Sequence, residues 1–383
     1  MLCNRGTKSP PIKEFLTPKG RLNEGSYCMI RTVLAGDIGG TKTVLRLVSS
    51  EAGGPGHAVP FLTTLWERTY SSRSFADLVP MVHQFFKEAS ESSVSIPAVD
   101  SACFGIAGAI ADNASELTNL NWSLSCERLL KALDIPRVTL INDFAAIGYG
   151  IAGLQDGQLA TLQAGVPDPA APVAIIGAGT GLGEGFFIPD PDGTLRAFPS
   201  EGGHTDFAPR SGLEFQLLTY LLEKNNLPRV SVERVASGTG IASIYQFFRD
   251  TNPREESAAM TEIFQAWSRE IGRKDKTVDL AAEVSKAALS GSDFLCEQTM
   301  NLFITVYGAA AGNLALMILP YGGLYVAGGI APKILRMLQQ GDFMKAFCSK
   351  GRMRPLLEKI PVHVILDPRV GLIGAALTAV RKI

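Results

Sequence analysis

Two glycine-rich turns, each set between two apolar runs, constrain the fold of this chain more than any other feature. The first lies in residues 33–47, VLAGDIGGTKTVLRL, and the second in residues 173–187, VAIIGAGTGLGEGFF. An apolar run that enters a glycine corner, followed by another that leaves it, is typical of a β-hairpin. The sequence therefore predicts two hairpins with glycine-rich tips.

Hairpins of this kind differ from the two common phosphate-binding loops, because those loops run from a strand into a helix. Glycine and threonine at a hairpin tip leave backbone N–H groups open toward an anion. Two such tips in one chain predict a duplicated clamp for the phosphates of a nucleotide. The alternative is that both are tight hairpin corners with no ligand, although such a corner alone does not require the Asp-x-Gly-Gly-Thr of the first turn.

Strand-like and helical patterns alternate along the rest of the chain. Apolar, β-branched runs predict strands at residues 61–70, 102–107, 137–143, 323–329 and 361–366. Helical spacing or small apolar residues predict helices at residues 74–90, 144–154, 330–340 and 371–381, with mostly helical structure from Leu213 onward. We therefore expect an α/β fold with two related halves, each a sheet carrying helices, and a cleft between them.

The composition is that of a globular enzyme. The chain has 383 residues, enough for two domains, with 46% hydrophobic and 19% charged residues. The formal charge of -1 gives no electrostatic reason to expect nucleic acid or a membrane as a partner. No uninterrupted apolar run approaches the ~18 residues of a spanning helix. The six cysteines are scattered without a Cys-x-x-Cys pair, which predicts reduced thiols rather than disulfides or zinc ligands.

Residues 1–30 differ from the remainder. They carry Arg5, Lys8, Lys13, Lys19 and Arg21 against two acidic residues and show little apolar periodicity. This pattern predicts a flexible or surface-draped extension. A targeting role for it is poorly supported because it lacks an apolar core segment. We expect a cytoplasmic protein.

Five motifs follow one another in order along the chain. They are GDIGGT at 36–41, LINDF at 140–144, GAGTGLG at 177–183, EGGHTDF at 201–207 and AGGI at 327–330. In this order and spacing the chain resembles the bacterial-type glucokinases of the sugar-kinase and actin-like ATPase superfamily, a group that also includes glucokinases of some protists. The resemblance runs from about residue 33 to about residue 376.

The resemblance implies the two-domain actin-like ATPase fold, of ribonuclease H type, with duplicated halves. It implies an N-terminal extension over residues 1–30, a small α/β domain over 31–153 plus 367–383, and a large α/β domain over 154–366. It also implies a homodimer.

The nucleotide site follows from the needs of phosphoryl transfer. Hydrogen-bond donors and a metal must surround the charge that spreads over the γ-phosphate oxygens. The residues expected to bind ATP are Gly36, Asp37, Gly39, Gly40, Thr41 and Lys42, then Gly179, Thr180 and Gly181, and finally Gly328 and Gly329. Asp37 is the carboxylate expected to hold Mg²⁺, through water.

The sugar site needs a carboxylate that accepts the proton of the attacking hydroxyl. Asp143, at the end of a predicted strand, is expected to be this general base, although helix capping alone also favours Asp there. Asn142 offers a donor and an acceptor to sugar hydroxyls. By the resemblance, the hexose is also bound by Glu201, His204 and Glu233, of which Glu233 is predicted on a helix and has the weakest local evidence.

Two further features concern the sugar site and a possible zinc site. Asn121 and Trp122 could contact sugar, or Trp122 could be a core residue. The related group of repressors, open reading frames and sugar kinases usually carries a Cys-x-Cys-Gly-x-x-Gly-Cys zinc loop after its Glu-x-Gly-His segment. Here Glu201–His204 continues without nearby cysteines. No zinc is expected, and the chain resembles the non-zinc glucokinase branch.

The resemblance implies phosphorylation of glucose by ATP at the 6-hydroxyl, giving glucose 6-phosphate and ADP, the first step of glycolysis. A kinase of another hexose, such as fructose, mannose or glucosamine, is the alternative. A sugar-binding protein without catalysis would not need Asp143. An actin-like ATPase that acts through interactions would lack the Asn142–Asp143 and Glu201–His204 pairs, and the chain has both.

Overall fold

The computed structural model describes most of the chain, and the structural statements below concern those residues. They are residues 30–51, 59–92, 96–108, 110–117, 119–191, 194–252, 255–273 and 277–381. The predicted N-terminal extension, residues 1–30, lies outside the described residues except for its last position.

Contacts divide the chain into two compact units. Unit 1 comprises Met1–Leu159, Phe187–Pro199 and Asp367–Ile383, and unit 2 comprises Ala160–Phe186 and Ser200–Leu366. Residues 187–199 are therefore part of unit 1, together with the strands near the N-terminus. The domain limits implied by the resemblance stay a prediction.

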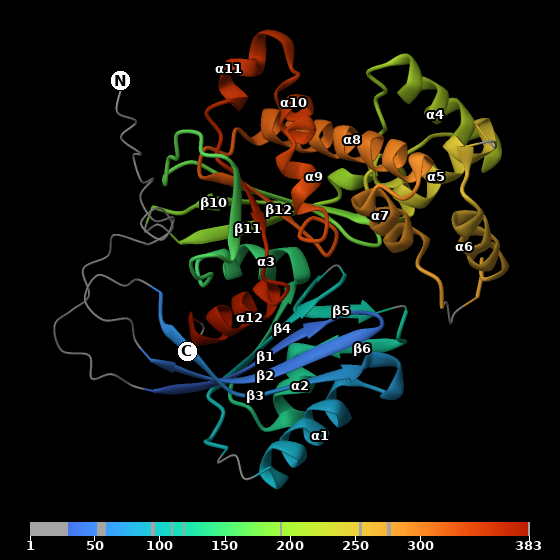
Figure 1. Ribbon diagram of the computed structural model, residues 1–383. Helices are drawn as coiled ribbons and strands as arrows, with labels where there is room; N and C mark the ends of the chain where they lie inside the picture. The colour runs from blue at the N-terminus through green and yellow to red at the C-terminus, as the bar shows by residue number, and fades with distance from the viewer. Residues whose placement is uncertain are drawn as a thin grey trace, which may run out of the picture. The chain divides into compact units, whose positions relative to one another are not determined.

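Unit 1 is built on a five-stranded sheet of order β3-β2-β1-β4-β7 (Figure 1). The strands β1, β2 and β3 pair antiparallel, whereas β4 and β7 continue parallel to β1. Its elements are β1 Arg31–Ile38, β2 Lys42–Glu51, β3 Phe61–Ser71, α1 Leu78–Glu91, β4 Ser101–Ile106, β5 Ala114–Leu117, β6 Trp122–Ser125, α2 Cys126–Leu133, β7 Val138–Asn142, α3 Asp143–Ile151 and α12 Val370–Arg381.

Helices cover both faces of this sheet. Side chains alternate along β1, so that Leu34 and Ile38 pack in the core with α1 and α2, while Val33 and Ala35 pack in the core with α12. Figure 1 shows α1 and α2 on one face of the sheet and α12 on the other. Burial of each such aliphatic side chain contributes about 1.5–3 kcal/mol. Because both faces of the sheet are covered, β1 is apolar along most of its length instead of alternating between apolar and polar residues.

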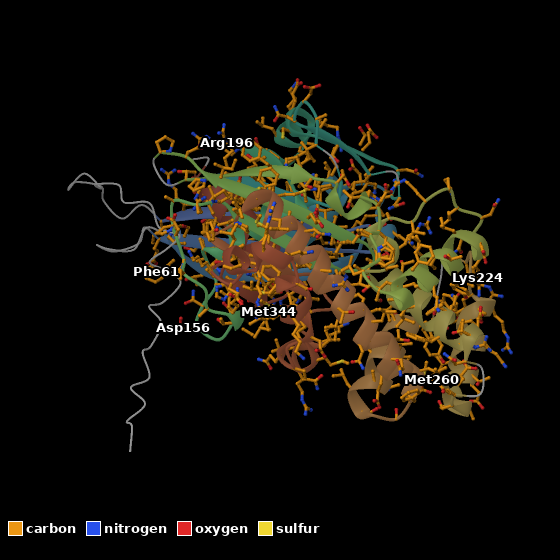
Figure 2. The ribbon with its side chains drawn as sticks, turned by 90° about the horizontal axis from the view of Figure 1, so that it is seen from above. Phe61, Asp156, Arg196, Lys224, Met260 and Met344 are labelled. Atoms are coloured by element: carbon orange, nitrogen blue, oxygen red, sulfur yellow. The ribbon has the colours of Figure 1, made fainter. Side chains whose placement is uncertain are left out.

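Unit 2 is built on a six-stranded sheet of order β11-β10-β9-β12-β13-β8, of which the outer part of β10 and β11 is counted with unit 1. Figure 2 labels Lys224 of α4 and Met260 of α6 at the same end of this unit. The elements are β8 Leu159–Gln163, β9 Val173–Ala178, β10 Leu182–Pro189, β11 Leu195–Ser200, α4 Gly212–Lys224, α5 Gly238–Thr251, α6 Ala258–Arg269, α7 Leu280–Ser290, α8 Phe294–Ile318, β12 Gly323–Ala327, α9 Leu335–Gln339, α10 Asp342–Cys348, α11 Arg354–Leu357 and β13 Val362–Ile365.

Five strands of each sheet follow the same scheme. Three consecutive strands lie side by side, β1-β2-β3 in one sheet and β9-β10-β11 in the other. Two later strands then continue parallel to the first of the three, β4 and β7 in unit 1 and β12 and β13 in unit 2. Each glycine-rich turn joins the first two of these three strands. The prediction of two related halves, with a glycine hairpin in each, is confirmed.

Helix α8 is the central helix of unit 2. Within the described residues it is long and apolar enough to cross a membrane by length and composition, but 67% of that window is buried inside the structure. A helix of this length was not predicted from the sequence, because polar, uncharged residues interrupt its apolar run. The helix contains a single charged residue, Glu297. Its burial identifies α8 as a core helix of unit 2.

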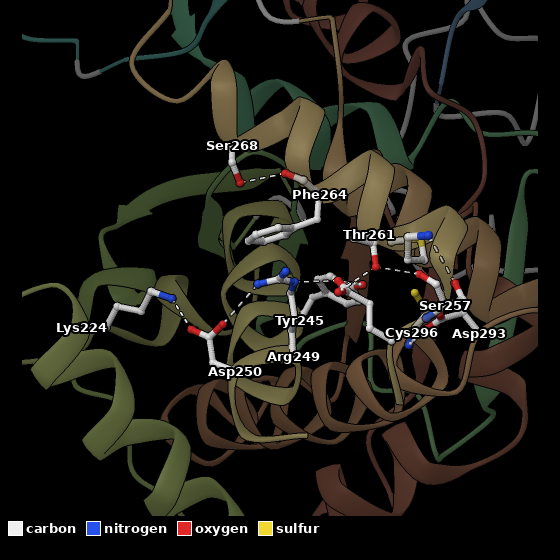
Figure 3. Close-up of polar contacts among 12 residues, drawn as sticks. Lys224, Tyr245, Arg249, Asp250, Ser257, Thr261, Phe264, Ser268, Asp293 and Cys296 are labelled. Carbon is white, nitrogen blue, oxygen red and sulfur yellow. Dashed lines mark hydrogen bonds and ion pairs between the residues drawn. The ribbon is translucent and has the colours of Figure 1, made fainter. Parts of the chain in front are cut away.

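A polar network joins the helices of unit 2 (Figure 3). The carboxylate of Glu256 accepts hydrogen bonds from the Tyr245 hydroxyl at 3.0 Å and from Arg249 Nε at 2.7 Å, both on α5. Asp293 accepts the N–H of Cys296 at 2.8 Å and that of Ser257 at 3.2 Å. Since Asp293 is the N-cap of α8 and Ser257 that of α6, one carboxylate connects the starts of two helices.

Helices α3 and α12 of unit 1 pack backbone against backbone. A Cβ on Gly374 would lie 1.8 Å from the carbonyl oxygen of Ala146, and one on Gly150 would lie 1.9 Å from that of Val370. Only glycine permits so close an approach. The contact holds the helix that follows β7 against the C-terminal helix.

Most predicted elements are confirmed, with two corrections. The segment expected as a helix over 330–340 is a series of turns followed by the short α9, and Glu233 lies on a 3-10 turn, Val232–Arg234, instead of a helix. The expected helix over 74–90 begins later, at Leu78, because Asp77 caps its N-terminus. The strands β5, β6, β8 and β11 were not anticipated.

We predict that Gly374→Ala lowers the free energy of unfolding by about 1–3 kcal/mol, the usual penalty of overpacking. The reason is the 1.8 Å approach of the added methyl group to the Ala146 carbonyl. Urea unfolding followed by circular dichroism measures the free energy of unfolding of the variant and of the wild type. Gly371→Ala on the same helix is the matched control, since its Cβ would meet only Ile147 Cγ1 at 3.8 Å. Equal stability of the two variants would contradict the packing account.

Candidate active site

The carboxylates predicted for catalysis and for metal binding lie at one edge of the unit 1 sheet. Asp37 is the seventh residue of β1, and Asn142 ends β7. Strand β4 separates β1 and β7, pairing Gly105 with Asp37 on one side and Ile106 with Asn142 on the other. Because the three strands are parallel, their carboxyl ends meet at the same edge. The register therefore brings Asp37 and Asp143 into one neighbourhood.

Asn142 is the N-cap of α3. Its Oδ1 accepts the N–H of Phe144 at 2.9 Å and that of Ala145 at 3.4 Å, and its Nδ2 donates to the Gly108 carbonyl at 3.2 Å. The capping role considered for Asp143 thus belongs to Asn142, and Asp143 is the first helical residue. The Asn142 side chain also hydrogen-bonds the carboxylate of Asp143, which lowers the pKa of Asp143.

Asp143 is half-buried, and one of its oxygens accepts the N–H of Phe144 at 2.9 Å. Burial raises the pKa of Asp143 to about 6, the hydrogen bond from Phe144 opposes this, and the charge of Asp37 raises it further. A carboxyl group with a pKa close to the working pH is suited to accept a proton in a transition state. The position of Asp143 therefore fits a general base.

Asp37 has the properties expected of a ligand for a hard cation. Burial raises the pKa of its carboxyl group, and the positive charge of Lys42 partly opposes this rise. Within the described residues no hydrogen-bond donor pairs with this carboxylate. Mg²⁺ is commonly held by one or two carboxylates together with water and substrate phosphates. The donor set at Asp37 fits Mg²⁺.

The first glycine turn is held by Ser72, a fully buried residue that the sequence analysis missed. Ser72 Oγ donates to the Gly39 carbonyl at 2.7 Å, and its N–H donates to the Thr41 carbonyl at 2.9 Å. Thr41 and Lys42 are exposed at the tip. Ser72 lies just after β3, where no sequence pattern distinguishes it from other linker serines. Gly36 is buried, and a Cβ there would lie 2.5 Å from Phe104 Cδ1, so packing explains this glycine.

The second glycine turn is held by two neighbouring segments of unit 2. The start of α5 binds it through Gly238 N–H to the Gly179 carbonyl at 2.8 Å and through Thr239 Oγ1 to the Thr180 carbonyl at 3.1 Å. On its other side, Glu233 Oε2 accepts the N–H of Leu182 at 3.0 Å. A Cβ on Gly179 would meet nothing within 4 Å, so the tip has open space beside it.

Gly328 lies next to this turn because β12 runs parallel to β9. Its φ of +84° is in the left-handed region, and a Cβ would lie 2.4 Å from the Ala178 carbonyl oxygen. Gly329 has open space around its Cβ position. Both glycines are exposed. The structure thus places the two unit 2 glycine motifs expected to bind ATP side by side.

The predicted sugar residues of unit 2 lie on two adjoining 3-10 turns. Glu201 precedes the turn Gly202–His204, and His204 is its last residue. The distance between Glu201 Oε2 and His204 Nε2 is 3.9 Å, and both side chains are exposed. The second turn, Val232–Arg234, carries Glu233. The two turns are joined by the hydrogen bond from Val232 N–H to the Thr205 carbonyl at 2.9 Å.

A pocket of about 410 Å³ opens between these two turns. His204 and Glu233 line it together with Arg229, Arg234 and Thr239 among others. Arg229 donates to the His204 carbonyl at 2.8 Å and to Asp206 Oδ1 at 3.0 Å, so it braces the turn that carries His204. The pocket brings together two of the three unit 2 residues expected to bind sugar; Glu201 is not among its lining residues.

Other predicted features have structural explanations. Trp122 is a core residue, 1% exposed, and its Nε1 donates to the Phe75 carbonyl at 3.3 Å, so the core alternative is correct. In the described part of the chain, Cys103, Cys126, Cys296 and Cys348 form no disulfide. In that part, no group of three or more His, Cys, Asp or Glu residues is arranged to hold a metal ion.

The sequence analysis also missed Glu184 of β10. Its side chain is 7% exposed, which is unusual for a carboxylate. The only sign of this buried carboxylate in the sequence is a glutamate within the otherwise apolar run 182–188.

The duplicated sheets, the two glycine hairpins and the polar residues beside them define a sugar kinase of the actin-like ATPase fold. Comparison with known proteins makes the assignment specific. The glucokinase family model matches residues 34–382, and the chain belongs to the glucokinase family. A glucokinase of the cyanobacterium Trichormus variabilis is 56% identical over 349 residues, covering 91% of this chain and 99% of that protein. A glucokinase of Synechocystis is also 56% identical over 349 residues, covering 91% and 98%.

Solved structures agree with this assignment. The glucokinase of an Antarctic psychrotroph has a TM-score of 0.74 at 29% identity, covering 92% of this chain and 100% of that chain. The Balamuthia mandrillaris glucokinase in complex with glucose has a TM-score of 0.68 at 20% identity, covering 96% and 97%, and shows the shared fold. A ROK family glucokinase from Streptomyces griseus, in complex with glucose and AMPPNP, shares the fold with a TM-score of 0.54 at 21% identity, covering 91% and 99%.

We predict that kcat at saturating glucose and ATP falls as the pH drops through about 6, the pKa to which burial raises Asp143. A general base acts only when ionised, so the rate at pH 5 is expected to be about tenfold below the plateau. Initial rates between pH 5 and 8 test this. A rate that stays flat down to pH 5 would remove Asp143 from the role of base.

Proposed function

We propose that this chain transfers the γ-phosphoryl group of ATP to the 6-hydroxyl of glucose, giving glucose 6-phosphate and ADP, the first step of glycolysis. The observation that carries the proposal is the partly buried Asp143 carboxyl, with a pKa of about 6, at the start of α3 beside Asp37. Membership in the glucokinase family supports the choice of glucose and ATP.

In this proposal Asp143 accepts the proton of the sugar hydroxyl while the hydroxyl oxygen attacks the γ-phosphorus. The pKa near 6 leaves Asp143 largely ionised at neutral pH and still basic enough to take the proton. The side-chain amide of Asn142 binds a sugar hydroxyl beside Asp143. Since Asn142 also caps α3, the same side chain orients the helix that carries the base.

Unit 2 supplies the remaining groups. Glu201, His204 and Glu233 bind hydroxyls of the hexose, as exposed polar groups of the two 3-10 turns. Gly179, Thr180 and Gly181 donate backbone N–H groups to phosphate oxygens, and Gly328 and Gly329 lie against the adenosine. Because the Glu233 carboxylate also accepts the Leu182 N–H, it connects the sugar pocket to the phosphate turn.

We also propose that Mg²⁺ is bound through Asp37, with Gly39, Gly40, Thr41 and Lys42 near the phosphates. When bound, this cation neutralises charge on the phosphate oxygens. The raised pKa of Asp37, caused first by burial, supports the assignment, because a cation offsets the cost of ionising a buried carboxyl.

Two further expectations complete the proposal. The enzyme acts as a homodimer in the cytoplasm, as the resemblance implies. The formal charge of -1 supports the expectation that neither nucleic acid nor a membrane is a partner.

A coupled assay for ADP release, with ATP and Mg²⁺ and with glucose, fructose, mannose, glucosamine or no sugar, tests the function. We expect rapid release with glucose. Rapid release without sugar would point to an ATPase, and preference for another hexose would favour the alternative kinase. Asp143→Asn should lower kcat by at least ~100-fold, the scale of general-base removal, with sugar KM changed only a few-fold.

The matched control for Asp143→Asn is Asp134→Asn. Asp134 is an exposed carboxylate of unit 1 whose φ of +52° lies in the left-handed region, which asparagine also adopts readily. This control should retain full activity. An Asp143→Asn enzyme within a few-fold of wild type would contradict the assigned base.

A separate prediction concerns the metal. Asp37→Asn should raise the Mg²⁺ concentration for half-maximal rate by roughly 10–100-fold, the usual range for disturbing the residues that hold a metal. Glucose affinity, measured by calorimetry without nucleotide, serves as the control and should stay unchanged. An unchanged Mg²⁺ requirement would exclude Asp37 as the metal residue.

A further inference from the structure

Glu184 is a buried carboxyl group to which the proposed reaction assigns no role. It is the third residue of β10, directly after the second glycine turn, and its side chain is 7% exposed. Within the described residues it forms no hydrogen bond and no ion pair. Burial raises the pKa of Glu184 to about 7. A carboxyl group in this state switches between neutral and charged forms near neutral pH.

The carboxyl group of Glu184 lies directly against the turn that bears Glu201 and His204. A Cβ on Gly202 would lie 2.0 Å from Glu184 Oε2 and 2.9 Å from its Cδ. A Cβ on Gly203 would lie 2.1 Å from the Leu182 carbonyl oxygen. Both glycines therefore allow the turn to rest on β10, and Glu184 is the side chain of β10 beneath Gly202.

The position of this turn decides where the two sugar-binding side chains point. The side chains of Glu201 and His204 are 90% and 56% exposed, and their contact with each other spans 3.9 Å. The backbone of Gly202 is held by Ser200 Oγ, which accepts its N–H at 3.0 Å, and by Thr205 Oγ1, which donates to its carbonyl at 2.7 Å. Exposed side chains with few contacts follow the backbone that carries them.

The charges around Glu184 do not compensate its ionised form. The pKa of Tyr307 on α8 is raised first by burial and also by the charge of Glu184. Glu201 and His204 lie on the turn itself, and Glu233 binds the start of β10 at Leu182. Arg229, which braces this turn, donates to the His204 carbonyl and to Asp206, not to Glu184. A negative charge on Glu184 is therefore buried without a cation.

We propose that Glu184 is a positioning residue for sugar binding. Its neutral carboxyl packs under Gly202 and holds Glu201 and His204 in place, whereas its ionised form draws water under the turn and weakens the binding of glucose. This inference rests on the proposed function, because it assigns the Glu201–His204 turn to glucose.

Calorimetric titration of glucose into the full chain without nucleotide, at pH 6, 7 and 8, tests the inference. For wild type we expect the Kd of glucose to rise roughly fivefold from pH 6 to pH 8, as follows if bound glucose raises the Glu184 pKa by about one unit. In Glu184→Gln, which keeps the shape and cannot ionise, the Kd should stay flat and close to the wild-type value at pH 6.

Steady-state kinetics provide a second test, because a purely structural role of Glu184 would not link the pH dependence of KM to its ionisation. The pH dependence of KM for glucose should disappear in Glu184→Gln, while the fall of kcat near pH 6 that belongs to Asp143 should remain. Glu283→Gln, a carboxylate on α7 of the same unit that is 39% exposed, is the matched control and should keep the wild-type pH dependence.

If the Glu184→Gln variant does not fold, hydrogen exchange of the amides of residues 202–205 in the wild-type protein tests the inference instead. Protection beyond the intrinsic rate should decrease between pH 6 and pH 8. A flat wild-type Kd, or a pH dependence that Glu184→Gln retains, would overturn the inference while leaving the proposed function intact. Absence of glucose binding at every pH would overturn both.

Discussion

The close contact between α3 and α12 is the constraint on which the catalytic part of unit 1 depends. Gly150 and Gly374 allow the two helix backbones to touch, at positions where any Cβ would overlap a carbonyl oxygen. Helix α3 begins at Asp143, so its orientation sets the direction of that carboxyl group. Helix α12 packs in turn on the β1 side chains Val33 and Ala35. The last helix of the chain thereby packs both on the helix that begins at Asp143 and on the strand that leads into the first glycine hairpin.

Burial of carboxyl groups without a full set of partners is the second theme of the structure. Asp37, Asp143 and Glu184 each have a raised pKa, and burial is the first cause in every case. An uncompensated buried charge destabilises a fold, so such groups are retained where a ligand or a proton offsets the cost. By contrast, Glu256 and Asp293 in the helical part of unit 2 are fully hydrogen-bonded, as expected of groups that only hold helices together.

Much of the fold was predictable because its determinants are local. Both hairpins follow from glycine corners between apolar runs, and the strand before Asn142 follows from its β-branched residues. The predicted helix over 330–340 was wrong because Gly328 takes a left-handed conformation and turns precede α9. Glu233 was placed on a helix because neighbouring charges suggest one, but a 3-10 turn bound to Thr205 holds it. Ser72 had no distinguishing pattern, since its role arises from contacts with a turn about 30 residues earlier in the chain.

The sequence by itself determined the two glycine hairpins, part of the order of strands and helices, and the chemical types available for catalysis, because these depend on neighbouring residues and on hydrophobic periodicity. Only the tertiary structure decided which side chains are buried and what they touch. It assigned the cap of α3 to Asn142, joined Glu233 to the second glycine turn, and set Glu184 beneath Gly202. Burial and electrostatic environment depend on segments distant in the chain, so no local pattern specifies them.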